Sequence, residues 1–335
     1  MKLFCFLLLL VFLAVVRSML NVQQSIARLG QEIVKKGYYL NPEINSNNYN
    51  GRSTILQLIQ VKNSKTRNVI GKINNEKSRF DKEIMNYQQI GAASRPSCFV
   101  QHEDVVALNG KQMIIMEKGF SDLGKFSATN GPIRGGELKS IAKQMVNIVD
   151  SFHAKNYVWG DMKLENIVLT TNNNERKGTY SCKAIDLESA VKVNTPLTDF
   201  SPEILGTQRA YITHLLIRLL TRLLIDVQFL EKLINKKSSY LNVDLESEIL
   251  GNKAMDIWAL GINLLSLYYG KPVLSKDLKI SMRVVQSYEE NLFDLGISGV
   301  DDILLKRLLQ SMLKSNAADR ATIGGVRSSL YLNTM

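Results

Sequence analysis

Short apolar runs separated by polar turns dominate the first third of the chain. Between Tyr38 and about Met116, stretches rich in Ile, Leu and Val alternate with Asn, Gly and Lys, which is the pattern of β-strands joined by turns. One helix is predicted among these strands, at about residues 80–90. Four strands are predicted, over residues 54–61, 68–73, 105–108 and 113–117.

After Gly119 the pattern becomes mainly helical. Residues 138–153 and 255–270 repeat apolar side chains with the helical period of about 3.6 residues. Residues 19–36 are predicted to form a shorter amphipathic helix that Gly37 ends, and a strand-like run occupies residues 167–170. A small strand-rich part followed by a larger helical part predicts an α+β fold.

The N-terminus predicts a secretory signal peptide at residues 1–18. Lys2 precedes an unbroken apolar run from residue 3 to residue 16, which Arg17 and Ser18 follow, and this is the residue order of a secretory signal. The run is shorter than the roughly twenty residues that span a bilayer, so a cleaved signal is favoured over a membrane anchor. The mature chain would begin at Met19 and be secreted or lie in the lumen of the secretory pathway.

Composition and charge narrow the possible partners. The formal charge of +11 favours anionic surfaces through long-range attraction, but no zinc-ligand cluster or RNA-binding signature accompanies it, so no nucleic-acid partner is expected. A composition of 45% hydrophobic and 22% charged residues is that of a globular protein. After the signal only Cys98 and Cys182 remain, too few for a disulfide framework. Cys182 is expected to be buried in a strand.

The candidate chemistry concentrates in the segment Trp159–Asn166, between a predicted helix and a predicted strand. Asp161, Lys163 and Asn166 offer a carboxylate, a cation and an amide, which together suit the positioning and charge balance of phosphoryl transfer. Their spacing, D-x-K-x-x-N, resembles the catalytic loop of the protein kinases. The resemblance implies that Asp161 accepts the proton of a substrate hydroxyl, that Lys163 meets the phosphate and that Asn166 binds a metal ion.

Other segments resemble further kinase motifs in the same order. KAIDLESA, at residues 183–190, is similar to the metal-binding D-F-G segment and implies that Asp186, at the end of a strand, binds magnesium. The segment V-I-G-K at residues 69–72 looks like V-A-I-K, so Lys72 would bind the α- and β-phosphates of ATP, with Glu83 as its ion-pair partner. Met116 stands at the position that resembles the gatekeeper, where plain core packing is the favoured interpretation, and Glu117 to Gly119 resemble the hinge.

Two segments near the C-terminus complete the resemblance. MDIWALG is similar to the D-x-W-x-x-G segment, whose Asp256 would brace the backbone of the catalytic loop, and AADRAT is similar to D-x-R-x-T, which implies a structural ion pair for Arg320. Three stretches compete for the substrate-loop motif A-P-E: residues 201–203, the segment from Gly206, and residues 246–248. Glu203 as the partner of Arg320 depends on the first of them.

The resemblance covers residues 50–325 and implies a bilobal protein kinase fold. The expected organisation is a helical extension at 19–36, an N-lobe at 37–118, and a C-lobe at 119–335 with an insertion at about 204–250. A signal peptide followed by one divergent kinase domain resembles the secreted effector kinases of intracellular parasites, such as the rhoptry family of apicomplexans.

The chain departs from the kinase pattern in several places. The loop that should cover the nucleotide is poor in glycine and keeps only Gly51. Trp159 and Gly160 replace the His and Arg before the catalytic aspartate, so control through a phosphorylated loop bound by that arginine is not expected. Glu188 replaces the glycine of D-F-G and is either a spare metal ligand or, as favoured, a side chain that points to solvent.

The insertion contains an amphipathic helix at about residues 211–235, with Arg218 and Arg222 on its polar side. It either packs on the large lobe, which is the favoured interpretation, or docks on a partner protein or an anionic membrane surface.

The expected function is that of an ATP- and Mg²⁺-dependent serine/threonine protein kinase acting on a protein substrate. Lys163 motivates the choice of serine and threonine. The alternative is a catalytically impaired pseudokinase that serves as a secreted scaffold or allosteric partner, supported by the glycine-poor loop and Glu188. Transfer to a small molecule or a glycan is a third possibility for a protein of the secretory route.

Overall fold

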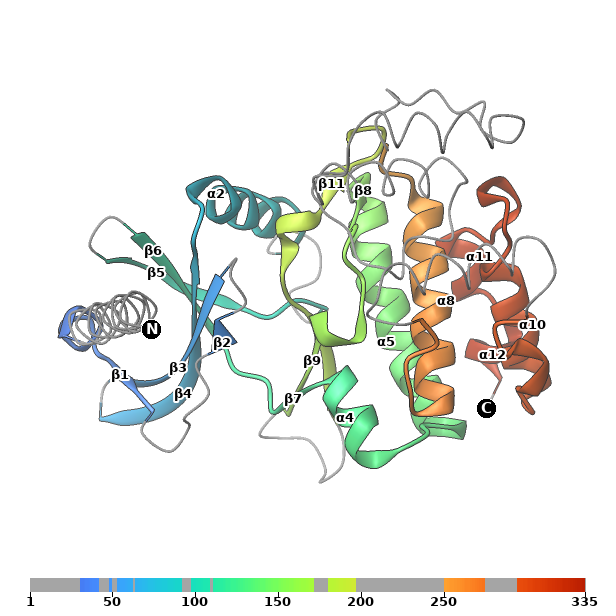
Figure 1. Cartoon of the computed structure of the whole chain (residues 1–335), viewed down its shortest axis with the longest axis horizontal. Coiled ribbons are helices and arrows are strands. Elements are labelled where there is room, and N and C mark those ends of the chain that lie inside the picture. Colours follow the sequence, from blue (N-terminus) through green and yellow to red (C-terminus); the bar gives the residue numbers. More distant parts are fainter. Residues whose placement is uncertain are drawn as a thin grey trace, which may run out of the picture. The chain divides into compact units, whose positions relative to one another are not determined.

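The computed structural model describes residues 31–41, 48–49, 53–62, 64–91, 98–108, 111–171, 180–196, 250–274 and 294–334. The chain divides into two compact units (Figure 1). Unit 1 comprises residues 1–82 and 100–118, and unit 2 comprises residues 83–99 and 119–335.

Unit 1 is built on one antiparallel sheet in the order β1-β3-β4-β6-β5, with β2 paired to β3. The four strands predicted from the sequence lie within β3, β4, β5 and β6. The strand bounds are β1 Tyr38–Leu40, β2 Asn48–Tyr49, β3 Ser53–Lys62, β4 Lys65–Asn74, β5 His102–Leu108 and β6 Lys111–Glu117.

One face of this sheet carries the core of unit 1. Leu56 and Leu58 alternate with more exposed neighbours along β3, as expected for a strand with one buried face, and Val69 lies opposite Leu58. Ile33, from the helical residues 31–35, joins the same cluster. The helix ends before Gly37, whose φ of +81° suits the one residue without a Cβ.

Helix α2 (Lys77–Asn86) begins in unit 1, and its last turn belongs to unit 2. It continues directly as the π-helical turn η1 (Tyr87–Gly91). The two together correspond to the helix predicted at about residues 80–90. π-Helical turns are uncommon and often occur at functional sites.

Unit 2 is mainly helical, and α8 is its central helix. Fourteen of the seventeen residues of α8 are buried, which marks a helix surrounded by its own domain, and α5 and α10 pack against it. The helix predicted at 138–153 lies within α5, and the one predicted at 255–270 lies within α8 except for its last residue, Gly270, which caps that helix. The helix bounds are α4 Leu123–Asn130, α5 Gly135–Ala154, α8 Lys253–Tyr269, α10 Ile303–Met312, α11 Ile323–Arg327 and α12 Leu330–Asn333.

Short strands and turns place the loops of unit 2. β9 pairs with β10 and β7, and β8 pairs with β11, so the segments that follow β8 and β10 emerge beside one another. β10 ends at Ala184, two residues before the end predicted at Asp186, because Asp186 leaves the extended conformation. The bounds are β7 Ser121–Asp122, β8 Tyr157–Val158, β9 Ile167–Thr170, β10 Ser181–Ala184, β11 Val191–Lys192, with 3₁₀ turns η3 Leu164–Asn166, η4 Leu187–Ser189, η6 Ile297–Gly299 and η7 Ala317–Asp319.

The protein thus has a mixed α+β fold, with an antiparallel sheet and several helices, as the sequence predicts. Cys182 is buried in β10 as expected, and burial raises the pKa of its thiol to about 12. Cys98 is also buried, and neither thiol forms a disulfide. Within the described ranges, none of the helices combines the length and apolar character needed to cross a membrane.

Several predicted features lie outside the described residues. These are the signal peptide at 1–18, residues 19–30 of the helical extension, the insertion at about 204–250 with its helix at 211–235, and all three candidates for the A-P-E motif. They stay predictions.

Replacing Gly270 with Ala should destabilise unit 2. Gly270 ends α8 with a φ of +67°, and an added Cβ would lie 2.5 Å from the backbone nitrogen of Pro132. We expect the free energy of unfolding to fall by about 2–4 kcal/mol, from left-handed strain plus the clash. Gly135→Ala is the matched control, since Gly135 also has a positive φ but nothing within 4 Å of its Cβ position. Urea denaturation of both variants measures the difference, and equal losses would contradict the clash.

Candidate active site

The loop between β8 and β9 gathers the three residues singled out in the sequence. The Lys163 Nζ donates to both carboxylate oxygens of Asp161, at 3.0 and 2.8 Å. The Asn166 Nδ2 donates to the Asp161 main-chain oxygen at 2.9 Å and to its Oδ2 at 2.8 Å. Asp161 is only 8% exposed, so these contacts fix its carboxylate in one orientation.

Asp256 braces this loop from α8, as the sequence predicts. Its carboxylate, fully buried, accepts hydrogen bonds from the backbone N–H of Trp159 at 3.0 Å and of Gly160 at 3.4 Å. The Nε2 of His153 lies 2.9 Å from the same carboxylate. Trp159 stacks on Phe152 with ring centroids 5.1 Å apart. The start of the loop is therefore held by buried hydrogen bonds and by aromatic packing.

Burial raises the pKa of Asp161 to about 6. The charge of Asp186 acts in the same direction, whereas Lys163 and the hydrogen bond from Asn166 oppose it. A carboxylate with a pKa near neutrality accepts a proton readily during a reaction, which is the property of a general base.

Asp186 lies beside this loop. The backbone N–H of Ile185 donates to the Asn166 main-chain oxygen at 3.0 Å, which ties the two segments together. Asp186 has φ 63° and ψ 61°, a left-handed conformation that costs a non-glycine residue about 1 kcal/mol or more and concentrates at functional sites. This conformation turns the backbone out of the extended path of β10.

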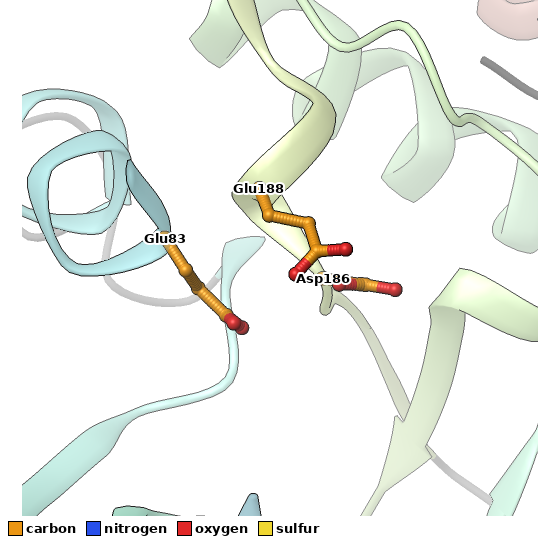
Figure 2. A group of neighbouring side chains, drawn as sticks. All are labelled: Glu83, Asp186 and Glu188. Atoms are coloured by element: carbon orange, nitrogen blue, oxygen red, sulfur yellow. The ribbon is translucent and has the colours of Figure 1, made fainter. Parts of the chain in front are cut away.

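The carboxylate of Asp186 lies close to two others. One oxygen each from Glu83, Asp186 and Glu188 lies within 4.8 Å of the others, and Figure 2 shows Glu83 coming from α2 while the other two come from the segment after β10. Glu83 is 1% exposed. Glu188 was expected to point to solvent. The structure corrects this, because the 3₁₀ turn η4 buries Leu187 and sets the Glu188 carboxylate beside the other two.

The donor atoms of this region suit a hard divalent cation. Carboxylate and amide oxygens are the ligands that Mg²⁺ prefers. The Nδ2 of Asn166 donates to Asp161, so its Oδ1 is the atom that could coordinate a metal ion. Asp186, Glu188 and Asn166 are thus the residues that would hold a magnesium ion.

Lys72 lies in unit 1, on β4 opposite Ile55 and Ile114, and is 6% exposed. Burial, together with the positive charge of Lys72, lowers the pKa of His102 to about 4. The side chain of His102 is therefore neutral at physiological pH beside the lysine ammonium. The ion pair of Lys72 with Glu83 stays a prediction, since these residues belong to different units.

The residues assigned to the gatekeeper and hinge lie at the end of β6. Met116 is 7% exposed and pairs with Ile70, in keeping with the favoured interpretation of core packing. Glu117 closes the strand, and its backbone N–H donates to the Gln101 oxygen at 3.0 Å. Gly119 packs in unit 2, where an added Cβ would lie 2.9 Å from the Leu169 oxygen.

Arg320 has a structural role. It is 6% exposed and donates to the main-chain oxygens of Lys314, Ala254 and Ser315 at 2.6, 3.1 and 3.0 Å. Its guanidinium also lies 4.7 Å from the ring centre of Trp258. Its predicted partner Glu203 and the loop residue Gly51 lie outside the described residues.

The sequence-based analysis missed Asn86 and His153 in unit 2, and His102, whose pKa the charge of Lys72 lowers, in unit 1. Asn86 lies one helical turn after Glu83, so a shared helix face was the available signal. His153 lies in the last turn of α5 among its buried residues, so its position on the apolar face of that helix was the available signal. No sequence pattern marks His102, because its neighbour Lys72 lies on a different strand.

In comparisons with known proteins, no family model matches this chain, and no curated protein sequence matches it significantly.

Proposed function

We propose that this protein is an ATP- and Mg²⁺-dependent protein kinase of the bilobal kinase fold, which phosphorylates serine or threonine hydroxyls of a protein substrate. The observation that carries the proposal lies within unit 2. Asp161, with Lys163 and Asn166 bonded to it, lies close enough to Asp186 for the charge of Asp186 to raise its pKa. A proton acceptor thereby adjoins a set of metal-binding oxygens, which is the pairing that phosphoryl transfer requires.

Each residue has a role that follows from its contacts. Asp161 accepts the proton of the substrate hydroxyl and orients its oxygen for attack, and its raised pKa suits this task. Lys163 holds the Asp161 carboxylate and supplies positive charge near the transferred phosphoryl group. Asp256 keeps the loop backbone in place.

Metal and nucleotide complete the proposed site. Bound Mg²⁺ neutralises the charge that develops on the phosphate oxygens. Asn166, Asp186 and Glu188 would supply the protein ligands of the ion, and Lys72 of unit 1 would bind the α- and β-phosphates. The third carboxylate is the feature that departs most from the family pattern, since glycine normally follows at the position of Glu188.

The alternative is a pseudokinase that acts as a scaffold or allosteric partner. The position of Glu188 favours it, because a third carboxylate within 4.8 Å of Asp186 and Glu83 adds negative charge where a triphosphate would bind. We favour an active enzyme, because the groups that carry charge in phosphoryl transfer are all present in the sequence.

A secreted or lumenal location completes the proposal and rests on residues 1–18. The rhoptry-type secreted kinases are the group that this combination of leader and kinase motifs resembles. A partner protein or an anionic membrane is proposed for the helix at 211–235.

Thermal denaturation with and without Mg²⁺ and ATP, followed by transfer of labelled γ-phosphate to a generic basic protein, tests the proposal. An active kinase should show a higher melting temperature with both ligands together and Mg²⁺-dependent incorporation on serine or threonine. Binding without transfer would favour the pseudokinase, and neither binding nor transfer would reject both.

A further inference from the structure

Asn86 joins α2 to the segment that follows Asp186. It is 1% exposed, and its Nδ2 donates to the main-chain oxygens of Leu187 at 2.7 Å and of Ala190 at 2.9 Å. Both amide hydrogens are used on carbonyl groups about a hundred residues away along the chain. A buried side chain that makes two such hydrogen bonds restrains both elements.

The two carbonyl groups converge because η4 is a single 3₁₀ turn. The Ala190 N–H donates to the Leu187 oxygen at 3.1 Å and closes the turn, and Asn86 bonds both ends of it. The Oδ1 of Asn86 is buried and has no hydrogen-bond partner among the described residues. Burying an oxygen without a hydrogen bond costs free energy. The stabilising contribution of this amide therefore comes from its Nδ2 group.

A second contact anchors the same stretch of helix. The hydroxyl of Tyr157, on β8, donates to Oε1 of Gln89 in η1. β8 pairs with β11, where Tyr157 lies opposite Lys192. The end of α2 is therefore bonded to η4 through Asn86. The π-helical turn is bonded through Gln89 to β8, the strand that pairs with β11 at the end of the segment 186–192.

We propose that Asn86 is a positioning residue that keeps Glu83, Asp186 and Glu188 assembled as one carboxylate cluster in the unphosphorylated chain. Glu83 precedes Asn86 by one turn of α2, and Glu188 lies between the two carbonyl groups that Asn86 binds, so this clamp sets the spacing of the cluster. As a statement about catalysis, the inference rests on the proposed function.

The clamp requires no cation before Asp161. The position holds Gly160, which has no side chain to bind a phosphate on a neighbouring loop. Three carboxylates close together repel one another, and Asp186 adopts a left-handed conformation. A neutral, buried donor pair restrains these elements without any modification of the chain.

Asn86→Leu tests the clamp in the full chain, because leucine fills a similar volume without hydrogen bonds. Asn333→Leu is the control. Asn333 lies on α12, and its Nδ2 also donates to two main-chain oxygens, those of Arg327 and Ser329, at 2.9 Å each. Two readouts are independent of catalysis: amide hydrogen exchange of residues 187–192 by mass spectrometry, and Mn²⁺ affinity by electron paramagnetic resonance. Both are repeated after phosphatase treatment of the wild-type protein.

In N86L we expect exchange of residues 187–192 to rise about tenfold or more, and Mn²⁺ affinity to fall about tenfold. N333L and phosphatase treatment should change neither quantity. Should N86L fail to fold, Asn86→Asp keeps the size and replaces the donor with an oxygen that faces two carbonyl groups, and the same rise in exchange of residues 187–192 is expected.

Unchanged exchange and Mn²⁺ affinity in N86L would overturn the clamp. Faster exchange of residues 187–192 in phosphatase-treated wild-type protein would also overturn it. Phosphoryl transfer is measured in parallel and judges the proposed function separately. A wild-type protein that transfers no phosphate, with exchange and Mn²⁺ binding changed as expected in N86L, rejects the kinase and retains the clamp. A wild-type protein that transfers phosphate, together with an N86L variant whose exchange and Mn²⁺ binding are unchanged, retains the kinase and rejects the clamp.

Discussion

Asp161→Asn should reduce phosphoryl transfer by about 10²–10⁴-fold, the usual contribution of a positioned general base. The amide of asparagine accepts no proton in this pH range, whereas its similar size fits the site and its one side-chain oxygen can still accept a hydrogen bond from Lys163 or Asn166. Transfer of labelled phosphate at saturating ATP and Mg²⁺ measures the loss. An Asn variant as active as the wild type would remove Asp161 from the mechanism.

The same substitution should stabilise the fold at neutral pH. The folded protein raises the pKa of Asp161 from 3.8 to about 6, chiefly through burial. A raised pKa means that the contribution of Asp161 to stability is fully present below about pH 4 and is lost as the pH rises through about 6. At about 1.4 kcal/mol per pH unit, D161N should be more stable by up to about 3 kcal/mol at pH 8.

Denaturation of both proteins between pH 4 and pH 8 checks this sign. The difference in unfolding free energy should grow with pH and level off above about pH 6 to 7. Asp319→Asn, which removes an exposed carboxyl in η7, is the control for the loss of one negative charge at the surface. A gain in D161N that stays constant with pH would instead point to packing or hydrogen bonding as its cause.

The fold class could be predicted from the sequence because it depends on local periodicity. Leu56 and Leu58 of β3 alternate with less buried neighbours, β4 ends in a largely apolar, mostly buried run, and α5 and α8 carry continuous apolar stripes, so each element is marked by its own residues. The end of β10 was misplaced because the turn at Asp186 depends on a left-handed backbone, which no pattern of apolar residues encodes.

The part of the candidate site that depends on local spacing could also be predicted from the sequence. Asp161, Lys163 and Asn166 lie within six residues of one another, so their spacing alone brings them together, and the structure shows their contacts. Asn86 and Glu188 depend on how α2 meets a segment about a hundred residues later. Contacts of that kind are set by tertiary packing, and a single sequence carries no direct signal for them.

Asp186→Ala should abolish metal-dependent transfer while leaving the fold intact. A bound metal ion stabilises the transition state of such reactions by several kcal/mol, and each 1.4 kcal/mol or so is a factor of ten in rate, so we expect a loss of about 10³-fold or more. The rise in melting temperature on adding Mg²⁺ with ATP should disappear in the same variant. Undiminished transfer by D186A would end the assignment of Asp186 as the metal ligand.

Glu188→Gln provides the graded comparison, because it removes one carboxylate of the same cluster and leaves Asp186 in place. If Glu188 coordinates the ion, the apparent Mg²⁺ affinity should fall about tenfold, with most of the transfer rate recovered at high Mg²⁺. If Glu188 instead repels the nucleotide, as the pseudokinase alternative requires, the substitution should tighten ATP binding. Titrations of Mg²⁺ at fixed ATP and of ATP at fixed Mg²⁺ separate these outcomes, since the two roles of the carboxylate act on different ligands.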